Sequence, residues 1–146
     1  MRSDLVVTGA AVSRFKHRGG ATLVSEAEVM QTREMLKRDW QRTVANRGFV
    51  PCIRTTLAKE VKSHGMRVVS LKRLRFPRLA RYMVAFRLLV DVRVSRRRVR
   101  VIWDLVLVGG NRTELTFTAT ASYGDRAALL AAERRLLRRL LIRTQA

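Results

Sequence analysis

The chain has 146 residues, of which 47% are hydrophobic, as expected for one globular domain with an apolar core. Its 31 basic residues outnumber the 11 acidic ones and give a net charge of +20, and all but five of the basic residues are arginines. This composition excludes a disordered chain, and no apolar run approaches the roughly 18 residues of a membrane-spanning helix. We therefore expect a single domain over residues 1–146.

The first elements are two strands. Alternation over residues 4–15 predicts the first strand, and a glycine-containing loop signal follows at 16–20. A second strand is predicted over about 21–30. Ser25 and Glu28 have the spacing of a capping box, so a helix that begins between them is the alternative, and we favour the strand.

Two helices follow. The first is predicted to begin after a capping Thr32 and to run to about Arg47, where Gly48 ends it. The second runs from Pro51 to a left-handed Gly65. Apolar residues spaced four apart predict the buried stripes, which are Leu36, Trp40 and Val44 in the first helix and Ile53, Leu57 and Val61 in the second.

The strongest strand signal is the alternation of apolar residues over 82–94, 99–108 and 112–121, which predicts three consecutive antiparallel strands. A less regular strand is predicted before them, over 66–76, where Pro77 interrupts it.

The loops between these three strands set the register. A four-residue loop at 95–98 pairs apolar residues with one another. A three-residue loop at 109–111, favoured over a two-residue turn of the two glycines, puts Trp103 opposite Phe117. We therefore expect Phe86, Trp103 and Phe117 near the middle of one apolar face.

A last helix is predicted after Ser122, with a leucine stripe on one side and arginines on the other. Together the elements predict an α+β domain. Its mostly antiparallel sheet has about six strands in the order ββ-α-α-ββββ-α, and the helices pack on one face.

The sequence contains no motif of a known catalytic or cofactor site, so we expect neither. His17 and His64 lack ligand spacing to Cys52, and no metal site is expected. Cys52 is expected to be a buried small hydrophobe rather than a reactive thiol. Asp91 and Asp104 are expected to pair with neighbouring arginines rather than to act as acid and base.

Two sets of side chains are candidates for binding. Aromatic residues between sheet and helix could line an apolar pocket, although they are more often plain core; they are Trp40, Phe86, Trp103 and Phe117. Guanidinium groups could bind anions, the candidates being Arg96, Arg97, Arg98, Arg134, Arg135, Arg138 and Arg139. A solvated charged face is the alternative, because no aromatic residues interleave with these arginines to stack on bases.

Several short runs carry a resemblance to a known group of proteins. They are FPRL at 76–79, Tyr82, FR at 86–87, WDLVLV at 103–108 and LTFT at 115–118, followed by the helix rich in Ala, Leu and Arg. In this order they resemble uncharacterised exported proteins of high-GC actinobacteria. Those proteins are distantly similar to PsbP-like domains and to the extracytoplasmic sensor domains of actinobacterial serine/threonine kinases.

The resemblance implies a non-enzymatic, extracytoplasmic accessory or sensor-like domain that binds an unidentified ligand or partner. No signal peptide follows Met1, so a cytoplasmic protein is expected if Met1 is the true start. The alternative function follows from the charge: a cytoplasmic basic protein that binds nucleic acid or another polyanion non-specifically. A GC-rich genome would also favour arginine codons, and the charge would then be only a solvated surface.

Overall fold

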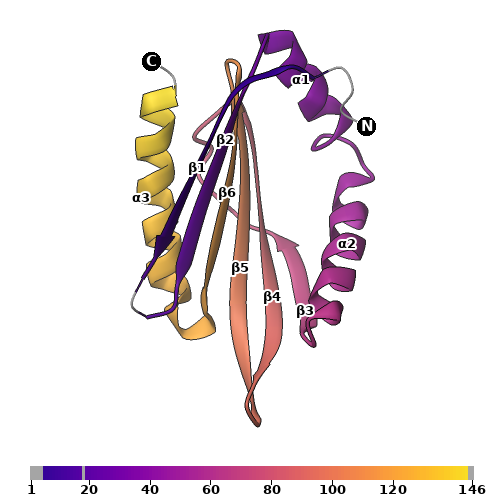
Figure 1. The fold of residues 1–146 in the computed structure, drawn as a ribbon, viewed down its shortest axis with the longest axis vertical. Coiled ribbons are helices and arrows are strands. Elements are labelled where there is room, and N and C mark those ends of the chain that lie inside the picture. The colour runs from indigo at the N-terminus through magenta and orange to yellow at the C-terminus, as the bar shows by residue number, and fades with distance from the viewer. Residues whose placement is uncertain (1–4, 18, 145–146) are drawn as a thin grey trace.

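The computed structural model describes residues 5–17 and 19–144; the first residue of the first predicted strand, residue 4, lies outside them. One antiparallel sheet of six strands, in the order β1-β2-β6-β5-β4-β3, forms the centre of the fold, and helices flank it (Figure 1). The expected α+β class and the order of elements are confirmed. The bounds are β1 Val7–Lys16, β2 Thr22–Met30, α1 Arg33–Arg42, α2 Phe49–Ser63, β3 Arg67–Arg73, β4 Tyr82–Val94, β5 Arg97–Gly110, β6 Thr113–Ser122 and α3 Arg126–Thr144, with a 3-10 turn at Tyr123–Asp125.

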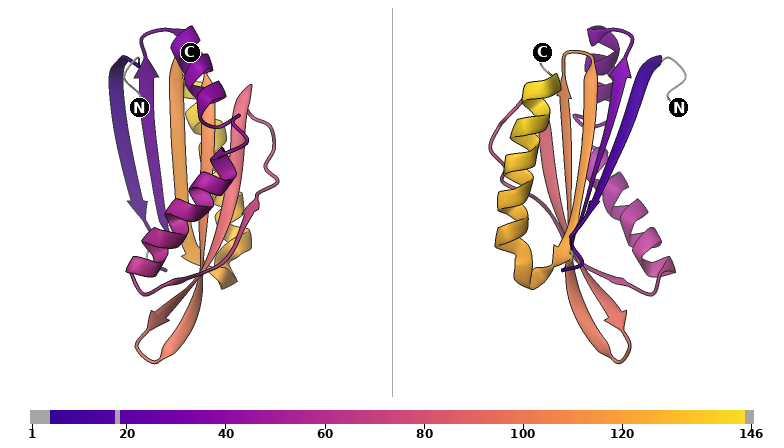
Figure 2. Two further views of the ribbon diagram at one scale, coloured as in Figure 1. Left: turned by 90° about the vertical axis from the view of Figure 1, so that its right-hand side faces the viewer. Right: turned by 60° about the vertical axis from the view of Figure 1, so that its left-hand side comes forward.

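The helices lie on both faces of the sheet. α1 and α2 lie on one face, which we call the groove face, and α3 packs along the other, which we call the α3 face (Figure 2). The expectation of helices on one apolar face describes α1 and α2 only. α3 covers the opposite face because the middle strands are apolar there too, as Ile102, Val106 and Val108 of β5 show by their complete burial.

The first central hairpin differs in register from the prediction by an even number of residues. Leu88 pairs with Trp103 and Phe86 with Leu105, and the strands are joined by a two-residue turn at Ser95-Arg96, where Ser95 has φ of 57°. The predicted four-residue loop is wrong because the strands continue pairing beyond the helices, where solvated arginines fit on both strands. An even shift keeps Phe86 and Trp103 on the same face, as expected.

The second hairpin differs by an odd number of residues, and Phe117 is therefore on the wrong face in the prediction. It pairs with Val106 on the α3 face, and the turn is Asn111-Arg112, with Asn111 at φ of 56°. Gly109 lies within β5 rather than in the loop. A Cβ there would lie 3.2 Å from Cβ of Tyr82 and 3.3 Å from a methyl group of Leu36, so glycine lets α1 approach the sheet.

The ends of the helices follow from their caps. Residues 22–30 form the favoured strand, and the Thr32 hydroxyl caps α1 by accepting a hydrogen bond from Met35 N at 3.1 Å. α1 ends at Arg42 rather than near Arg47, because the Thr43 hydroxyl donates to Asp39 O at 2.6 Å and turns follow. Gly65 has φ of 69° and ends α2 as predicted.

A buried ionic cluster lies between the sheet and α3. Arg87 of β4 donates two hydrogen bonds to Asp104 of β5, 2.7 Å from Nε to Oδ1 and 2.5 Å from Nη2 to Oδ2. Asp104 is fully buried, and the hydrogen bonds that its carboxylate accepts from Arg87 raise the pKa of Arg87. Asp104 thus pairs with an arginine as the sequence predicts, and this buried pair is bidentate.

Glu133 of α3 is the third member of the cluster and is also fully buried. Neither of its carboxylate oxygens accepts a hydrogen bond from any described residue, so its ionised form lacks a donor. Burial first, and then the negative charge of Asp104, raise the pKa of Glu133 from 4.5 to about 8. The raised pKa favours the protonated form of Glu133 at neutral pH, and a protonated carboxyl could donate a hydrogen bond to Asp104.

Glu133→Gln should remove a pH dependence of stability. Because the folded state raises this pKa from 4.5 to about 8, the contribution of Glu133 is fully present below about pH 4.5 and is lost as the pH rises through about 8. The wild-type free energy of unfolding should fall by roughly 4–5 kcal/mol over this range, and that of the variant should stay flat. Urea unfolding at several pH values measures both; parallel curves would refute the protonated Glu133, and exposed Glu34→Gln is the control.

Phe117→Ala should destabilise the protein more than Trp103→Ala. Phe117 is 2% exposed inside the α3 face, and its truncation should cost on the order of 3–5 kcal/mol. Trp103 is only half-buried on the groove face, so Trp103→Ala should cost less. Chemical denaturation of both variants decides; a larger loss at Trp103 would mean that α2 closes over it.

Candidate apolar groove

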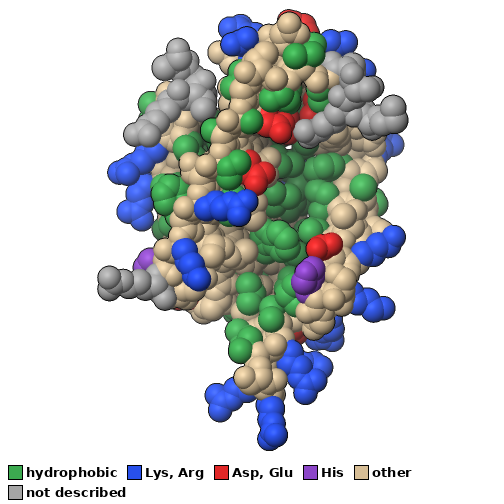
Figure 3. Space-filling view, in the orientation of Figure 1, with side chains coloured by type: hydrophobic (Ala, Val, Ile, Leu, Met, Phe, Trp, Pro, Cys, Tyr) green, Lys and Arg blue, Asp and Glu red, His purple; other side chains and the backbone are tan. Residues whose placement is uncertain are grey.

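α2 lies across the groove face but stands partly away from it. Among its described residues only Val61, near its carboxyl end, is buried, against Leu88 and Val90 of β4. Leu57, one turn before Val61, and Ile53, two turns before it, point to the same side and remain half-exposed. The space that they face is the hollow between α2 and the strands, which is lined by hydrophobic side chains (Figure 3).

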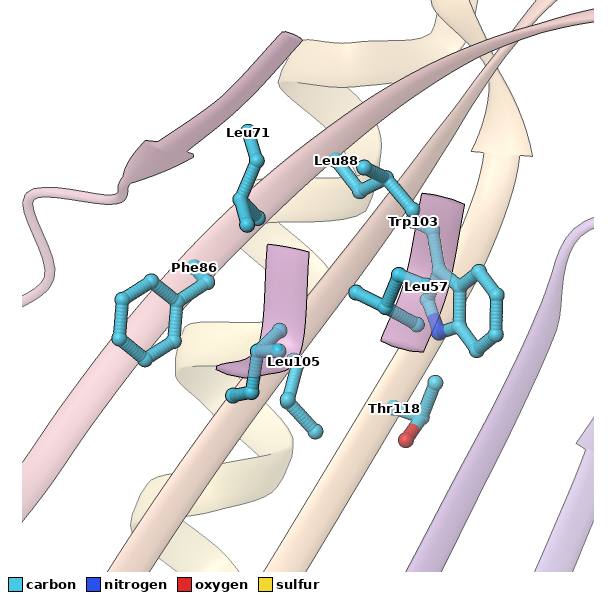
Figure 4. A pocket seen from close by; sticks show the side chains of 8 residues that line it. Leu57, Leu71, Phe86, Leu88, Trp103, Leu105 and Thr118 are labelled. Atoms are coloured by element: carbon cyan, nitrogen blue, oxygen red, sulfur yellow. The ribbon is translucent and has the colours of Figure 1, made fainter. Parts of the chain in front are cut away.

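This hollow, which we call the groove, has a volume of about 340 Å³, part of it open to solvent. Leu57 and Trp103 lie on one side of it and Phe86 and Leu71 on the other (Figure 4). The Thr118 hydroxyl and the indole N–H of Trp103 are the polar side-chain groups among the residues that line it. These residues are Ile53, Leu57, Leu71, Phe86, Leu88, Trp103, Leu105 and Thr118.

A second hollow adjoins the groove beneath the connection between α1 and α2. Leu71 and Phe86 line both, so the two form one trough along β3 and β4. The second hollow has a volume of about 810 Å³, also open to solvent, and Trp40 lies in its wall. Its rim is charged, because Arg73 of β3, which pairs with Phe86 on the groove face, lines it as well.

Three of the four predicted pocket aromatics meet in this trough. Phe86 and Trp103 line the groove, and Trp40 lines the adjoining hollow, where its ring lies 5.6 Å from that of Tyr82. Phe117 is on the opposite face, inside the core beneath α3. The prediction did not include Ile53, Leu57 and Leu71 among the pocket residues. Apolar residues spaced four apart have the same spacing whether the helix packs tightly on the sheet or lies away from it.

The structure does not bring the two predicted arginine groups together. Arg96, Arg97 and Arg98 occupy the tip of the β4–β5 hairpin, which projects beyond the helices (Figure 1). The arginines of α3 lie on a helix that runs away from that tip toward the other end of the molecule. In this second group Arg135, Arg138 and Arg139 are exposed, whereas Arg134 is half-buried with its guanidinium 5.9 Å from the Phe76 ring centre.

The remaining candidates give no catalytic centre. Arg67 and Arg100 flank Asp91, and the hydrogen bonds from Arg100 lower its pKa most, so it stays ionised as an ion-pair partner. Cys52 is exposed, which contradicts the expected buried position, because it lies on the solvent side of the first turn of α2. Within residues 5–17 and 19–144 no group of His, Cys, Asp and Glu side chains is placed to hold a metal ion.

No protein-family model and no curated protein matches the chain. A solved structure of a protein of unknown function, PA94 from Pseudomonas aeruginosa, is similar to it with 10% identity and a TM-score of 0.43, over 89% of this chain and 80% of that one. In the described part of the chain no helix is long and apolar enough to cross a membrane.

Proposed function

We propose that the protein is a non-enzymatic, sensor-like binding domain that takes an amphipathic anion with an aliphatic tail, such as a long-chain carboxylate. The observation that carries this proposal is the trough beneath α2, in which Phe86, Trp103 and Leu57 meet without closing the space between helix and sheet. Concave apolar sites with few polar groups are the usual form of small-molecule sites.

The groove suits a tail rather than a polar ligand. Seven of its eight lining side chains are hydrocarbon or aromatic. The eighth is Thr118, whose hydroxyl can donate to water and accept from water. A polar molecule would lose its hydration there without new partners, which costs free energy. An aliphatic tail would instead remove apolar surface of Leu57 and Trp103 from water.

The charged rim suits an anionic head. Arg73 lies next to Phe86 across the β3–β4 pair, on the groove face, so its guanidinium borders the trough at the shared wall of both hollows. Lys72, the neighbour of Arg73 in β3, pairs with Arg87 and faces the other side of the sheet, so Arg73 is the cation that borders the trough on β3. A carboxylate at this position would meet a fork of donors while its tail extended toward Trp103.

The proposal also includes the cellular location of the protein. The resemblance to exported actinobacterial proteins supports an extracytoplasmic location, and a sensor-like role supports a small ligand. The absence of a recognised catalytic motif is consistent with binding as the activity, and the proposal requires no chemistry in the trough.

Dodecanoate should bind in the groove and change the fluorescence of Trp103. In a Trp40→Phe background Trp103 is the sole tryptophan, so its emission should shift to the blue and saturate as the tail excludes water. Leu57→Glu should weaken binding at least tenfold, because it places a charge in the groove. Thr56→Glu, on the exposed side of the same helix turn, is the matched control and should bind like its parent.

The head-group contact has its own control. Arg73→Gln should weaken dodecanoate several-fold and leave dodecanol, which has no charge, unchanged. Equal binding of dodecanoate to the Leu57→Glu and Thr56→Glu variants would contradict the groove as the site. Absence of any saturable change would contradict the proposed ligand class.

A second candidate function, polyanion binding, rests on the projecting hairpin tip with its exposed Arg96, Arg97 and Arg98. The separation of this tip from the arginines of α3 favours two independent patches rather than one continuous groove. Each patch can make only a few phosphate contacts, and no aromatic side chain accompanies the tip arginines for base stacking.

We therefore expect weak, sequence-blind binding to DNA or RNA that is largely lost by about 0.2 M salt. The double variant Arg96→Glu/Arg97→Glu should reduce this binding partially, and so should the double variant Arg138→Glu/Arg139→Glu. Fluorescence anisotropy with unrelated oligonucleotides over a salt series measures this. Nanomolar, sequence-selective affinity that survives at that salt would make nucleic acid the principal ligand.

A further inference from the structure

β1 is the least covered element of the fold. It lies at the outer edge of the sheet and pairs only with β2 (Figure 2). Residues 10–17 are exposed without exception. Val12, on the groove face, is 57% exposed, and Phe15, on the α3 face, is 60% exposed. Both faces and the free edge of this strand are thus open.

The other edge strand has the features with which natural proteins protect sheet edges. β3 is seven residues long, has a bulge at Val69 and carries charged residues near both ends. In β1 the stretch Gly9–Ser13 contains no charge and no proline, and the single register shift falls at Thr8, near its start. Arg14 and Lys16 follow this stretch, but Gly9–Ser13 itself is an uncharged segment on an open edge, which is a template for pairing with another strand.

We propose that β1 pairs antiparallel with β1 of a second copy of this chain, with Val12 on the two-fold axis. The two six-stranded sheets then continue into one another through their β1 edges. An isologous contact of this kind closes on itself and leaves no further edge at β1. Because the axis is normal to the sheet, the groove faces of both copies lie on the same side.

The side chains of β1 are complementary to themselves in this register. Val12 faces Val12 of the second copy, which buries the most exposed apolar side chain of the groove face of β1. Phe15 faces Gly9 of the second copy, and an aromatic ring across from a strand glycine covers its bare backbone. Arg14 faces Ala10, so no like charges lie opposite each other.

Net charge opposes association. Each copy carries +20, but the arginine-rich hairpin tip and α3 lie on other elements than β1. Arg14 and Lys16 of β1 itself face Ala10 and Thr8 of the second copy rather than a like charge. At physiological ionic strength charges more than about 8 Å apart are largely screened. The dimer should therefore become tighter as salt is added, which is opposite to what nucleic-acid binding would show.

Sedimentation velocity of the full chain tests the association. We expect a dimer at tens of micromolar, with a larger dimer fraction at about 0.5 M than at about 0.05 M salt. Val12→Lys should sediment as a monomer with an unchanged melting temperature, since Val12 is exposed in the single copy. Val69→Lys, the equivalent change on the protected edge, should remain dimeric. A wild-type chain that stays monomeric at every salt concentration would overturn the proposal.

Cross-linking tests the register independently of affinity. In a Cys52→Ser background, which removes the native thiol, Val12→Cys should form an intermolecular disulfide on mild oxidation, because residue 12 meets itself at the axis. Ser13→Cys, whose partner would be Ala11, is the matched control and should form much less. Equal or faster cross-linking of the Ser13→Cys variant, or none of either, would overturn the proposed pairing.

Discussion

The structure depends on one constraint: the middle of the sheet is apolar on both faces, and the three helices cover only part of that surface. α3 runs along its face and closes it, so Phe117 and Val106 are buried to the level of a protein interior. On the groove face α1 closes one end through its contact with Gly109, and α2 touches the sheet chiefly through Val61. Two parts of the sheet therefore stay uncovered: the trough beneath α2 on the groove face, and the edge strand β1.

The two faces of the sheet differ in the polarity of the side chains that they carry. The closed α3 face contains Arg87, Asp104 and Glu133, whereas the open groove face presents leucines and aromatic rings to solvent. A buried ion pair adds little net stability, but it penalises any arrangement that separates the pair. A shift of α3 by one residue would move Glu133 away from Asp104 and change the set of side chains that face the Arg87–Asp104 pair. The cluster thus disfavours other positions of α3, while the open face keeps apolar surface available.

The sequence predicted the elements well because alternation and capping are local properties. Thr32, Gly65 and the alternating residues of β4, β5 and β6 act within a few positions of themselves. Register is not local, since the even error at Ser95 left Trp103 on its face and the odd error at Asn111 moved Phe117 to the other. Gly109 caused that second error, because only its packing against Leu36 shows that it belongs to a strand. Glu133 likewise falls among polar neighbours in the sequence, and nothing local shows that it is buried.

The trough and the β1 edge have a common origin but need not act on each other. The groove lies over β4, β5 and β6, and β2 separates it from β1 in the sheet. On the open side β6 presents Thr116, Thr118 and Thr120, whereas β2 presents Thr22, Val24, Glu26 and Glu28. The hydroxyl groups of Thr22 and Thr120 hydrogen-bond to each other across the two strands. A ligand in the groove would therefore meet the β6 threonines and then Glu26 of β2 before it reached Val12. Binding at one site changes affinity at the other only if the ligand interacts differently with the monomer and the dimer. A tail confined beneath α2 has no such difference, whereas one that crossed β6 and β2 to reach β1 would couple the two.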